Sequence, residues 1–190
     1  MGAMEHEDKD VIVSIRTQHA FTLIELLLAL AVSAILMAVA APSLKHALTR
    51  NRVIQADNQM VSALNLSRIE AINHGTYTIV CPSSDGIRCH PGQNWEGGWL
   101  MGIDENHDFQ PDGAPEHVFG PLAEGIRMHS SRGRLRVRYQ PDGSAPGSNI
   151  SLIVCHAGQP QSALKVVVSN SGRPRQGTAS ARQARACSDS

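Results

Sequence analysis

The chain has 190 residues, with 17 lysines and arginines against 17 aspartates and glutamates, so its formal net charge is zero. This balance excludes a protein that is basic or acidic over its whole surface, so any binding by charge must depend on where the charges lie. Four cysteines occur without a Cys-x-x-Cys pair, which argues against the common zinc modules.

The first element along the chain is an apolar run over residues 21–42 that contains one carboxylate, Glu25. A helix of about 20 apolar residues is long enough to cross a bilayer. An acidic side chain within the hydrocarbon costs about 2.5–3.5 kcal/mol or more. A plain single-pass anchor, the simpler interpretation, has no use for such a charge, so we expect Glu25 to have a specific role.

The residues before this run, 1–20, are polar and form a candidate leader. In an ordinary secretory signal the small residue at the cleavage site follows the apolar core, whereas here Ala20 precedes it. Cleavage after Ala20 would therefore leave the apolar run on the mature protein as an anchor. The sequence leaves open whether the natural start is Met1 or Met4.

The helix is predicted to continue to His74. From Arg50 onward, apolar and small residues recur at three- and four-residue spacing, which places them on one helix face. Gly75 is the stop signal, and Pro42 should kink or loosen the helix locally. The residues expected on the buried face are Val53, Ala56, Met60, Ala63, Leu64, Ser67 and Ala71.

The part after Gly75 is long enough for one domain. Short β-prone runs alternate there with Gly, Pro, Asn and Asp. The fold class is therefore α+β, with a long N-terminal helix packed on an antiparallel β-sheet domain. The strands are expected at 76–81, 98–103, 116–119, 126–130, 135–139, 150–155 and 164–169. The expected organisation is a leader at 1–20, a membrane-spanning helix at 21–42, its amphipathic continuation at 43–75, and a β domain with a basic tail at 76–190.

The four cysteines, if they lie beyond the membrane in an oxidising periplasm, indicate disulfides. Three connectivities are available. We favour Cys81–Cys89, which closes a short loop, and Cys155–Cys187, which ties the tail to a late strand.

Charge is segregated along the chain. Residues 85–124 contain eight acidic residues and one arginine, a net charge of −7, whereas residues 127–190 contain ten basic residues and two aspartates, a net charge of +8. Nine of those ten bases are arginine, whose planar fork suits bidentate phosphate contacts. One cluster alternates with other residues and would present four guanidinium groups on one strand face, either for binding or as a solvated surface. It consists of Arg132, Arg134, Arg136 and Arg138.

The other cluster lies in the tail, where Gly172-Arg173-Pro174-Arg175 is followed by Arg182 and Arg185. We expect a loop stiffened by its proline, the alternative being a merely soluble basic tail. Phosphate contacts alone are independent of sequence and sensitive to salt. Because the tail has no aromatic residue to stack on bases, the pattern favours the backbone of duplex DNA over single strands.

The N-terminal pattern Ala20-Phe21-Thr22-Leu23-Ile24-Glu25, followed by the apolar run, resembles the class III signal of type IV pilins and pseudopilins. It departs from that signal in having Ala20 where the family prefers glycine. The resemblance implies cleavage before Phe21 by a prepilin peptidase and N-methylation of Phe21. It also implies pairing of Glu25 with the Phe21 amine, other pilin subunits as partners, and a single pass in the inner membrane before incorporation into the pilus.

The order of later motifs is similar to the GspH/FimT family of minor pilins and pseudopilins. These motifs are the helix end at 67–71, Gly75, the first two cysteines, and the segments 95–99, 104–106 and 169–173. Closest is the FimT-type minor pilin that binds DNA during natural transformation, which implies DNA contacts by Gly172, Arg173 and Arg175. From charge alone we add Arg182 and Arg185, with Arg132, Arg134, Arg136, Arg138 and Lys165 as secondary contacts.

Other functions fit less well. No catalytic signature is present, so we expect no enzyme and no cofactor. The polar segment 104–108 lacks the glycine and distal glutamate of a calcium loop, and zinc at Cys81, Cys89 and His90 or His156 would have an unusual spacing. The alternatives are a structural minor pilin that initiates or caps pilus assembly, or a GspH-type minor pseudopilin of type II secretion.

Overall fold

The computed structural model of the chain describes residues 22–189. The chain divides after Ser43 into two units. The predicted leader and the cleavage site between Ala20 and Phe21 lie outside the described residues.

Helix α1, Leu23–His74, begins in the first unit. There the backbone N–H of Glu25 donates to Thr22 Oγ1 at 3.3 Å, and the large apolar side chains are exposed, with Leu23 at 78%. By length and composition α1 is apolar enough to cross a membrane. The predicted helix from the apolar run to His74 is confirmed, while a kink at Pro42 stays a prediction.

The second unit begins within α1, and its helical face is the one that the sequence predicted. All seven residues expected on that face are buried. The helix ends at Gly75, which has φ +62°, and the N–H of Thr76 donates to Ala71 O at 3.2 Å. A glycine with positive φ directly after the last turn is the usual way to close a helix.

Two antiparallel sheets pack against this part of α1 within the described residues. The first sheet has the strand order β3-β2-β1-β5, and the second has the order β4-β6-β7-β8. The strands of the first sheet are β1 (Thr78–Pro82), β2 (Trp99–Ile103), β3 (His117–Phe119) and β5 (Val137–Tyr139). Those of the second are β4 (Ile126–Ser130), β6 (Ile150–His156), β7 (Gln159–Val168) and β8 (Pro174–Thr178).

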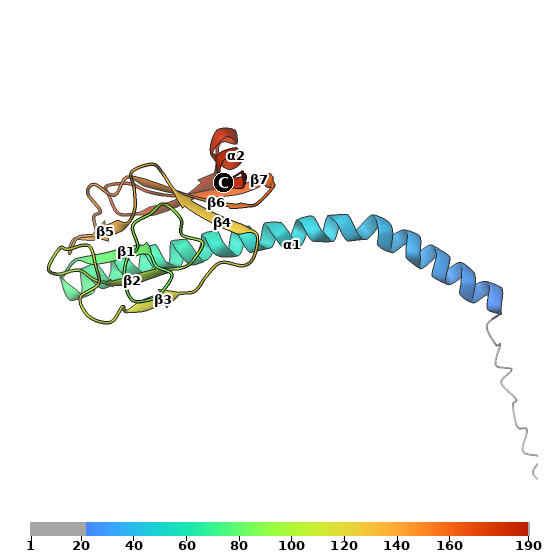
Figure 1. The fold of residues 1–190 in the computed structure, drawn as a ribbon, viewed down its shortest axis with the longest axis horizontal. Helices are drawn as coiled ribbons and strands as arrows, with labels where there is room; N and C mark the ends of the chain where they lie inside the picture. The colour runs from blue at the N-terminus through green and yellow to red at the C-terminus, as the bar shows by residue number, and fades with distance from the viewer. Residues whose placement is uncertain (1–21, 190) are drawn as a thin grey trace, which may run out of the picture. The chain divides into compact units, whose positions relative to one another are not determined.

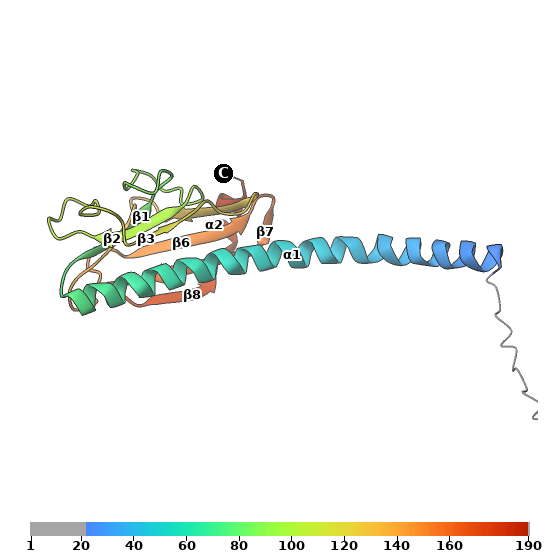
Figure 2. The ribbon, with the colours of Figure 1, turned by 90° about the horizontal axis from the view of Figure 1, so that it is seen from below.

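The main core lies between α1 and the inner faces of both sheets. Side chains alternate along each strand, so every second residue points inward. From the first sheet, Val80, Met101 and Val137 enter the core, and Met128 and Leu152 enter it from the second. Figure 2 shows β8 running alongside α1, so the second sheet reaches the flank of the helix.

Each sheet also buries part of its outer face. On the first sheet, Ile79 and Leu100 pack with Phe109 and the disulfide Cys81–Cys89. On the second sheet, helix α2, Ala181–Ser188, covers a small cluster around the disulfide Cys155–Cys187. Figure 1 shows α2 on the side of β6 and β7 that faces away from α1. The two disulfides have the pairing that the sequence favoured.

The structure corrects the sequence analysis in the tail. Of the expected loop at 172–175, residues 172 and 173 lie outside any strand, but Pro174 and Arg175 begin the edge strand β8, and α2 follows it. A proline is tolerated at the first residue of an edge strand because no ladder hydrogen bond is needed from its nitrogen. Pro174 occupies that position, opposite Val168 of β7.

A second correction concerns the run of alternating arginines. The expected strand over 135–139 is shortened to Val137–Tyr139. Arg132 lies in a turn in which Gly133 has φ +74° and the N–H of Arg134 donates to Ser131 O at 2.9 Å. The four guanidinium groups therefore do not share one strand face.

Candidate functional site

The first two tail arginines lie at the edge of the second sheet, Arg175 on β8 and Arg173 directly before it. Arg173 and Arg175 are both exposed, and Arg175 lies opposite Val167 of β7. The neighbouring Gln176 points toward α1, so alternation along the strand directs Arg175 to the opposite face. Arg175 is thus presented to solvent by a hydrogen-bonded strand.

Gly172, the buried residue before the exposed Arg173, is held in place by its surroundings. It is buried, has φ +77°, and donates its N–H to Ser169 O at 2.9 Å. A Cβ atom at this position would collide with the carbonyl oxygen of Gly143. A residue with a side chain would therefore have to move the turn, so the glycine is required by close packing as well as by its dihedral angle.

The inner side of β8 is tied to α1 by Gln176. Its Nε2 donates to Asp57 Oδ2 at 2.6 Å and to Asn58 Oδ1 at 2.8 Å. Burial raises the pKa of the Asp57 carboxyl, and the hydrogen bond from Gln176 opposes that rise. Among the described residues, Asp57 Oδ1 has no hydrogen-bond partner. The sequence analysis missed Asp57, because a single acid in an amphipathic helix is usually exposed.

Helix α2 carries the other two tail arginines. Ser180 caps it in a capping box with Gln183. The helix buries Ala184 and Cys187, three residues apart, and exposes Arg182 and Arg185 on its other side. Its disulfide to β6 holds the helix in place, so both arginines project from a fixed element.

We call Arg173, Arg175, Arg182 and Arg185 the basic edge. Within residues 22–189, none of the four makes an ion pair with a carboxylate. Lys165, the secondary residue on β7, is half-buried and lies opposite Gly177 of β8. The structure therefore brings Gly172, the basic edge and Lys165 onto one sheet and the helix that covers it.

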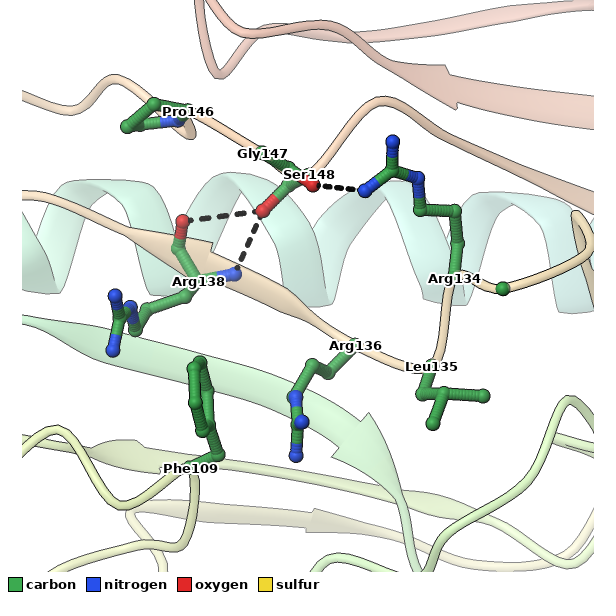
Figure 3. Close-up of a pocket in the computed structure, with 9 residues that line it drawn as sticks. Phe109, Arg134, Leu135, Arg136, Arg138, Pro146, Gly147 and Ser148 are labelled. Atoms are coloured by element: carbon green, nitrogen blue, oxygen red, sulfur yellow. Dashed lines mark hydrogen bonds between the residues drawn. The ribbon is translucent and has the colours of Figure 1, made fainter.

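Three of the four arginines of the alternating run at 132–138 line a cavity of about 300 Å³ beside β5, which we call the arginine pocket. Its lining includes Arg134, Arg136, Arg138, Phe109, Gly147 and Ser148. Arg134 Nη1 donates to Gly147 O at 2.6 Å, and the N–H of Arg138 donates to Ser148 Oγ at 3.2 Å (Figure 3). Arg132 instead borders a different cavity, next to Gln183 and Cys187.

The ring of Phe109 lies between two guanidinium groups (Figure 3). Its centroid is 4.0 Å from Arg136 Cζ and 4.6 Å from Arg138 Cζ. Arg138 Nη1 is also 3.7 Å from Asp104 Oδ2. Burial raises the pKa of the Asp104 carboxyl, while the N–H of Phe109, donated to Oδ1 at 3.1 Å, lowers it. Sequence reasoning missed Phe109, which belongs to the acidic segment and gives no local signal of its arginine neighbours.

In the structure, the two cysteines considered for a zinc site are bonded to each other. Cys81 and Cys89 are both oxidised in their disulfide, so neither is available to zinc. Over residues 22–189, no group of three or more His, Cys, Asp or Glu side chains is placed to hold a metal ion. Asp112 Oδ2, in the polar turn after Asp104, accepts the N–H of Glu105 at 2.6 Å.

Two family models match the chain. The model described as "Type II transport protein GspH" matches residues 56–172, and the one described as "Prokaryotic N-terminal methylation motif" matches residues 15–41. No curated protein matches. The methylation motif and the apolar part of α1 fit a pilin anchored by a single membrane pass.

Two crystal structures of the type IV minor pilin FimU from Pseudomonas aeruginosa have a similar fold. The one in space group P21 is 16% identical, with a TM-score of 0.55 over 70% of this chain and 92% of that chain. The one in space group P65 is 14% identical, with a TM-score of 0.52 over 65% and 90%. These values support the predicted pilin-like fold. Because the GspH model matches more than half of its residues, the chain belongs to the GspH family of minor pilins and pseudopilins.

Proposed function

We propose that this chain is a minor type IV pilin that binds double-stranded DNA through its basic edge during natural transformation. The observation that carries the proposal is the basic edge itself. Of its four exposed arginines, Arg175 lies on β8, Arg173 directly precedes that strand, and the other two lie on α2. None makes an ion pair within the described residues. Guanidinium groups bind phosphate oxygens in pairs of hydrogen bonds, so such a surface suits the DNA backbone.

The basic edge is also ordered before any ligand arrives. Gly172, the Gln176–Asp57 hydrogen bond and the Cys155–Cys187 disulfide each fix part of it. Ordering side chains and loops on binding lowers affinity, so a surface that is already ordered binds more tightly. The absence of aromatic residues from 172–189 favours duplex DNA, since single-strand sites stack bases on aromatic rings.

The test is fluorescence anisotropy of a labelled duplex with the full-length protein in detergent, over a range of salt concentrations. Arg173→Gln with Arg175→Gln should weaken binding to any duplex sequence and reduce the log–log salt slope by about 1.8, since each lost phosphate contact removes about 0.9. The matched control is Arg52→Gln with Arg88→Gln, which removes two exposed arginines elsewhere and should change little. Wild-type affinity in the tail variant, or no binding by the wild type at low salt, would overturn the proposal.

The apolar part of α1 supplies the filament half of the proposal. Its exposed apolar side chains are covered by lipid in the inner membrane and by the helices of other pilin subunits after assembly. A prepilin peptidase removes residues 1–20, and Glu25 then pairs with the methylated amine of Phe21. Mass spectrometry of the membrane-extracted protein should find a chain that begins with methylated Phe21, and an intact leader beside an active peptidase would contradict this.

A second candidate function is favoured by the description of the matching family, which names type II transport. In that case the chain is a minor pseudopilin of a secretion system, or a structural minor pilin that initiates or caps the pilus. Neither role needs the basic edge. If deletion of the gene abolishes secretion or piliation, and the wild-type protein fails to bind DNA, this candidate replaces the first.

A further inference from the structure

The arginine pocket concentrates positive charge without using it within the chain. No acidic residue lines the pocket among those described. The carboxylate of Asp104 lies outside this lining, with its Oδ2 at 3.7 Å from Arg138 Nη1. Arg136 makes no ion pair within residues 22–189. Its guanidinium group instead makes a cation–π contact with the ring of Phe109. The pocket therefore keeps an unneutralised cation beside open space.

The backbone of Phe109, which lines the pocket, is in a strained conformation. Its φ of +67° is rare for an aromatic residue, and such strain persists where the surroundings enforce it and often marks functional sites. Here Asp104 Oδ1 accepts the N–H of Phe109, and the ring packs against Ile79 and Leu100. Arg136 Cζ lies over the ring at 4.0 Å from its centroid. A contact with the ring face uses none of the N–H donors of Arg136 in a hydrogen bond, so these donors are able to bind an anion.

The pocket and the basic edge share one loop. Gly172 packs on the carbonyl of Gly143, and the N–H of Ala145 donates to Asn170 O at 2.9 Å. Only a few residues later, Gly147 forms the wall of the pocket and accepts the hydrogen bond from Arg134. Four residue steps, from Gly143 to Gly147, span at most about 14 Å.

We infer that the arginine pocket binds a phosphate group of the same duplex that contacts the basic edge, with Arg136 as its principal ligand. This inference rests on the proposed function and extends the DNA surface across the loop at 143–148. A duplex carries one charge per about 1.7 Å of its axis, so its phosphates are closely spaced and can serve a pocket and a basic edge that are joined by one short loop. Arg132 borders a different cavity, next to α2, and is not a ligand of this pocket.

The experiment compares Arg136→Gln with the control Arg88→Gln, which removes an exposed arginine from the acidic segment. Full-length protein in detergent is titrated with a labelled 20-base-pair duplex at several salt concentrations. Arg136→Gln should reduce the log–log salt slope by about 0.9, and Arg88→Gln should leave it unchanged. Arg136→Lys should restore the slope but only part of the affinity, because lysine keeps the charge and loses the planar fork.

A measurement on the wild type covers the case in which Arg136→Gln fails to fold. Modification of arginines by phenylglyoxal, mapped by mass spectrometry, should show Arg136 protected by the duplex and Arg88 not protected. Equal protection of the two, or an unchanged slope in Arg136→Gln, would overturn the inference while leaving the basic edge intact. A variant that binds DNA normally but fails to enter pili would also overturn it, and would assign the pocket to a carboxylate of a neighbouring subunit. If the wild-type protein does not bind the duplex at any salt concentration, the proposed function and this inference are both refuted.

Discussion

The two sheets of the second unit solve the same packing problem by different means. Both sheets pack one face against α1, and both carry a disulfide on the other face. The first sheet is covered there by a loop whose disulfide joins residues 8 apart, and the second by α2, whose disulfide joins residues 32 apart. An isolated helix of fewer than about 12–15 residues is marginal in water. We therefore expect α2, at 8 residues, to depend on its disulfide in a way that the first sheet does not.

Removing each disulfide in turn tests this difference and should give the largest effects. By loss of chain entropy, Cys155→Ser with Cys187→Ser should lower the free energy of unfolding by about 3.7 kcal/mol, against about 2.6 kcal/mol for Cys81→Ser with Cys89→Ser. Urea titration of both variants measures these values. DNA affinity should fall in the first variant because the basic edge loses order, and should hold in the second. Equal losses of affinity would show that the tail does not depend on its own disulfide.

Substitution of Gly172 should have the next largest effect. Gly172→Ala places a methyl group against the Gly143 carbonyl and also strains a φ of +77°. The matched control is Gly158→Ala, where φ is +71° and no atom lies within 4 Å of the new methyl group. The control should cost about 1–2 kcal/mol, the usual penalty of this conformation, and Gly172→Ala should cost more. Thermal unfolding measures both, and equal losses would show that the close packing of the turn does not contribute.

Much of the fold could be predicted because its signals are local. The spacing of Val53, Met60 and Leu64 along α1 fixed which helix face is buried, and the structure confirms it. The sequence left three cysteine connectivities open, and the one that we favoured is the one in the structure. The division into two sheets could not be predicted in this way, since it depends on which strands pair, and pairing is a long-range property.

The candidate site shows the same limit. The arginines of residues 132–138 belong by sequence to the basic part of the chain, yet β5 pairs with β1 in the first sheet. That pairing brings Arg138 to Asp104 and Phe109, from the acidic segment. Strand β8 was missed because Gly172, Pro174 and Gly177 make a poor strand pattern, and its pairing with β7 overrides that local preference.

The smallest expected effect concerns the contact that joins the second sheet to α1. Burial raises the pKa of Asp57 above its ordinary value of 3.8, so the folded protein binds a proton there more tightly than the unfolded chain. The free energy of unfolding should therefore fall as pH rises from below 3.8 through the raised pKa. Asp57→Asn keeps an oxygen to accept from Gln176 and removes the titration, so it should raise stability at neutral pH and flatten the pH dependence.

The exposed Asp142 provides a control of opposite sign. Hydrogen bonds from Ser144 lower the pKa of Asp142, so its stabilisation is present above pH 3.8 and is lost as pH falls through the lowered pKa. Asp142→Asn should thus reduce stability at neutral pH, where Asp57→Asn increases it. Urea titrations at pH 3, 5 and 7 distinguish the two. If both substitutions change stability in the same direction, the burial of the Asp57 charge is not what governs the contact between β8 and α1.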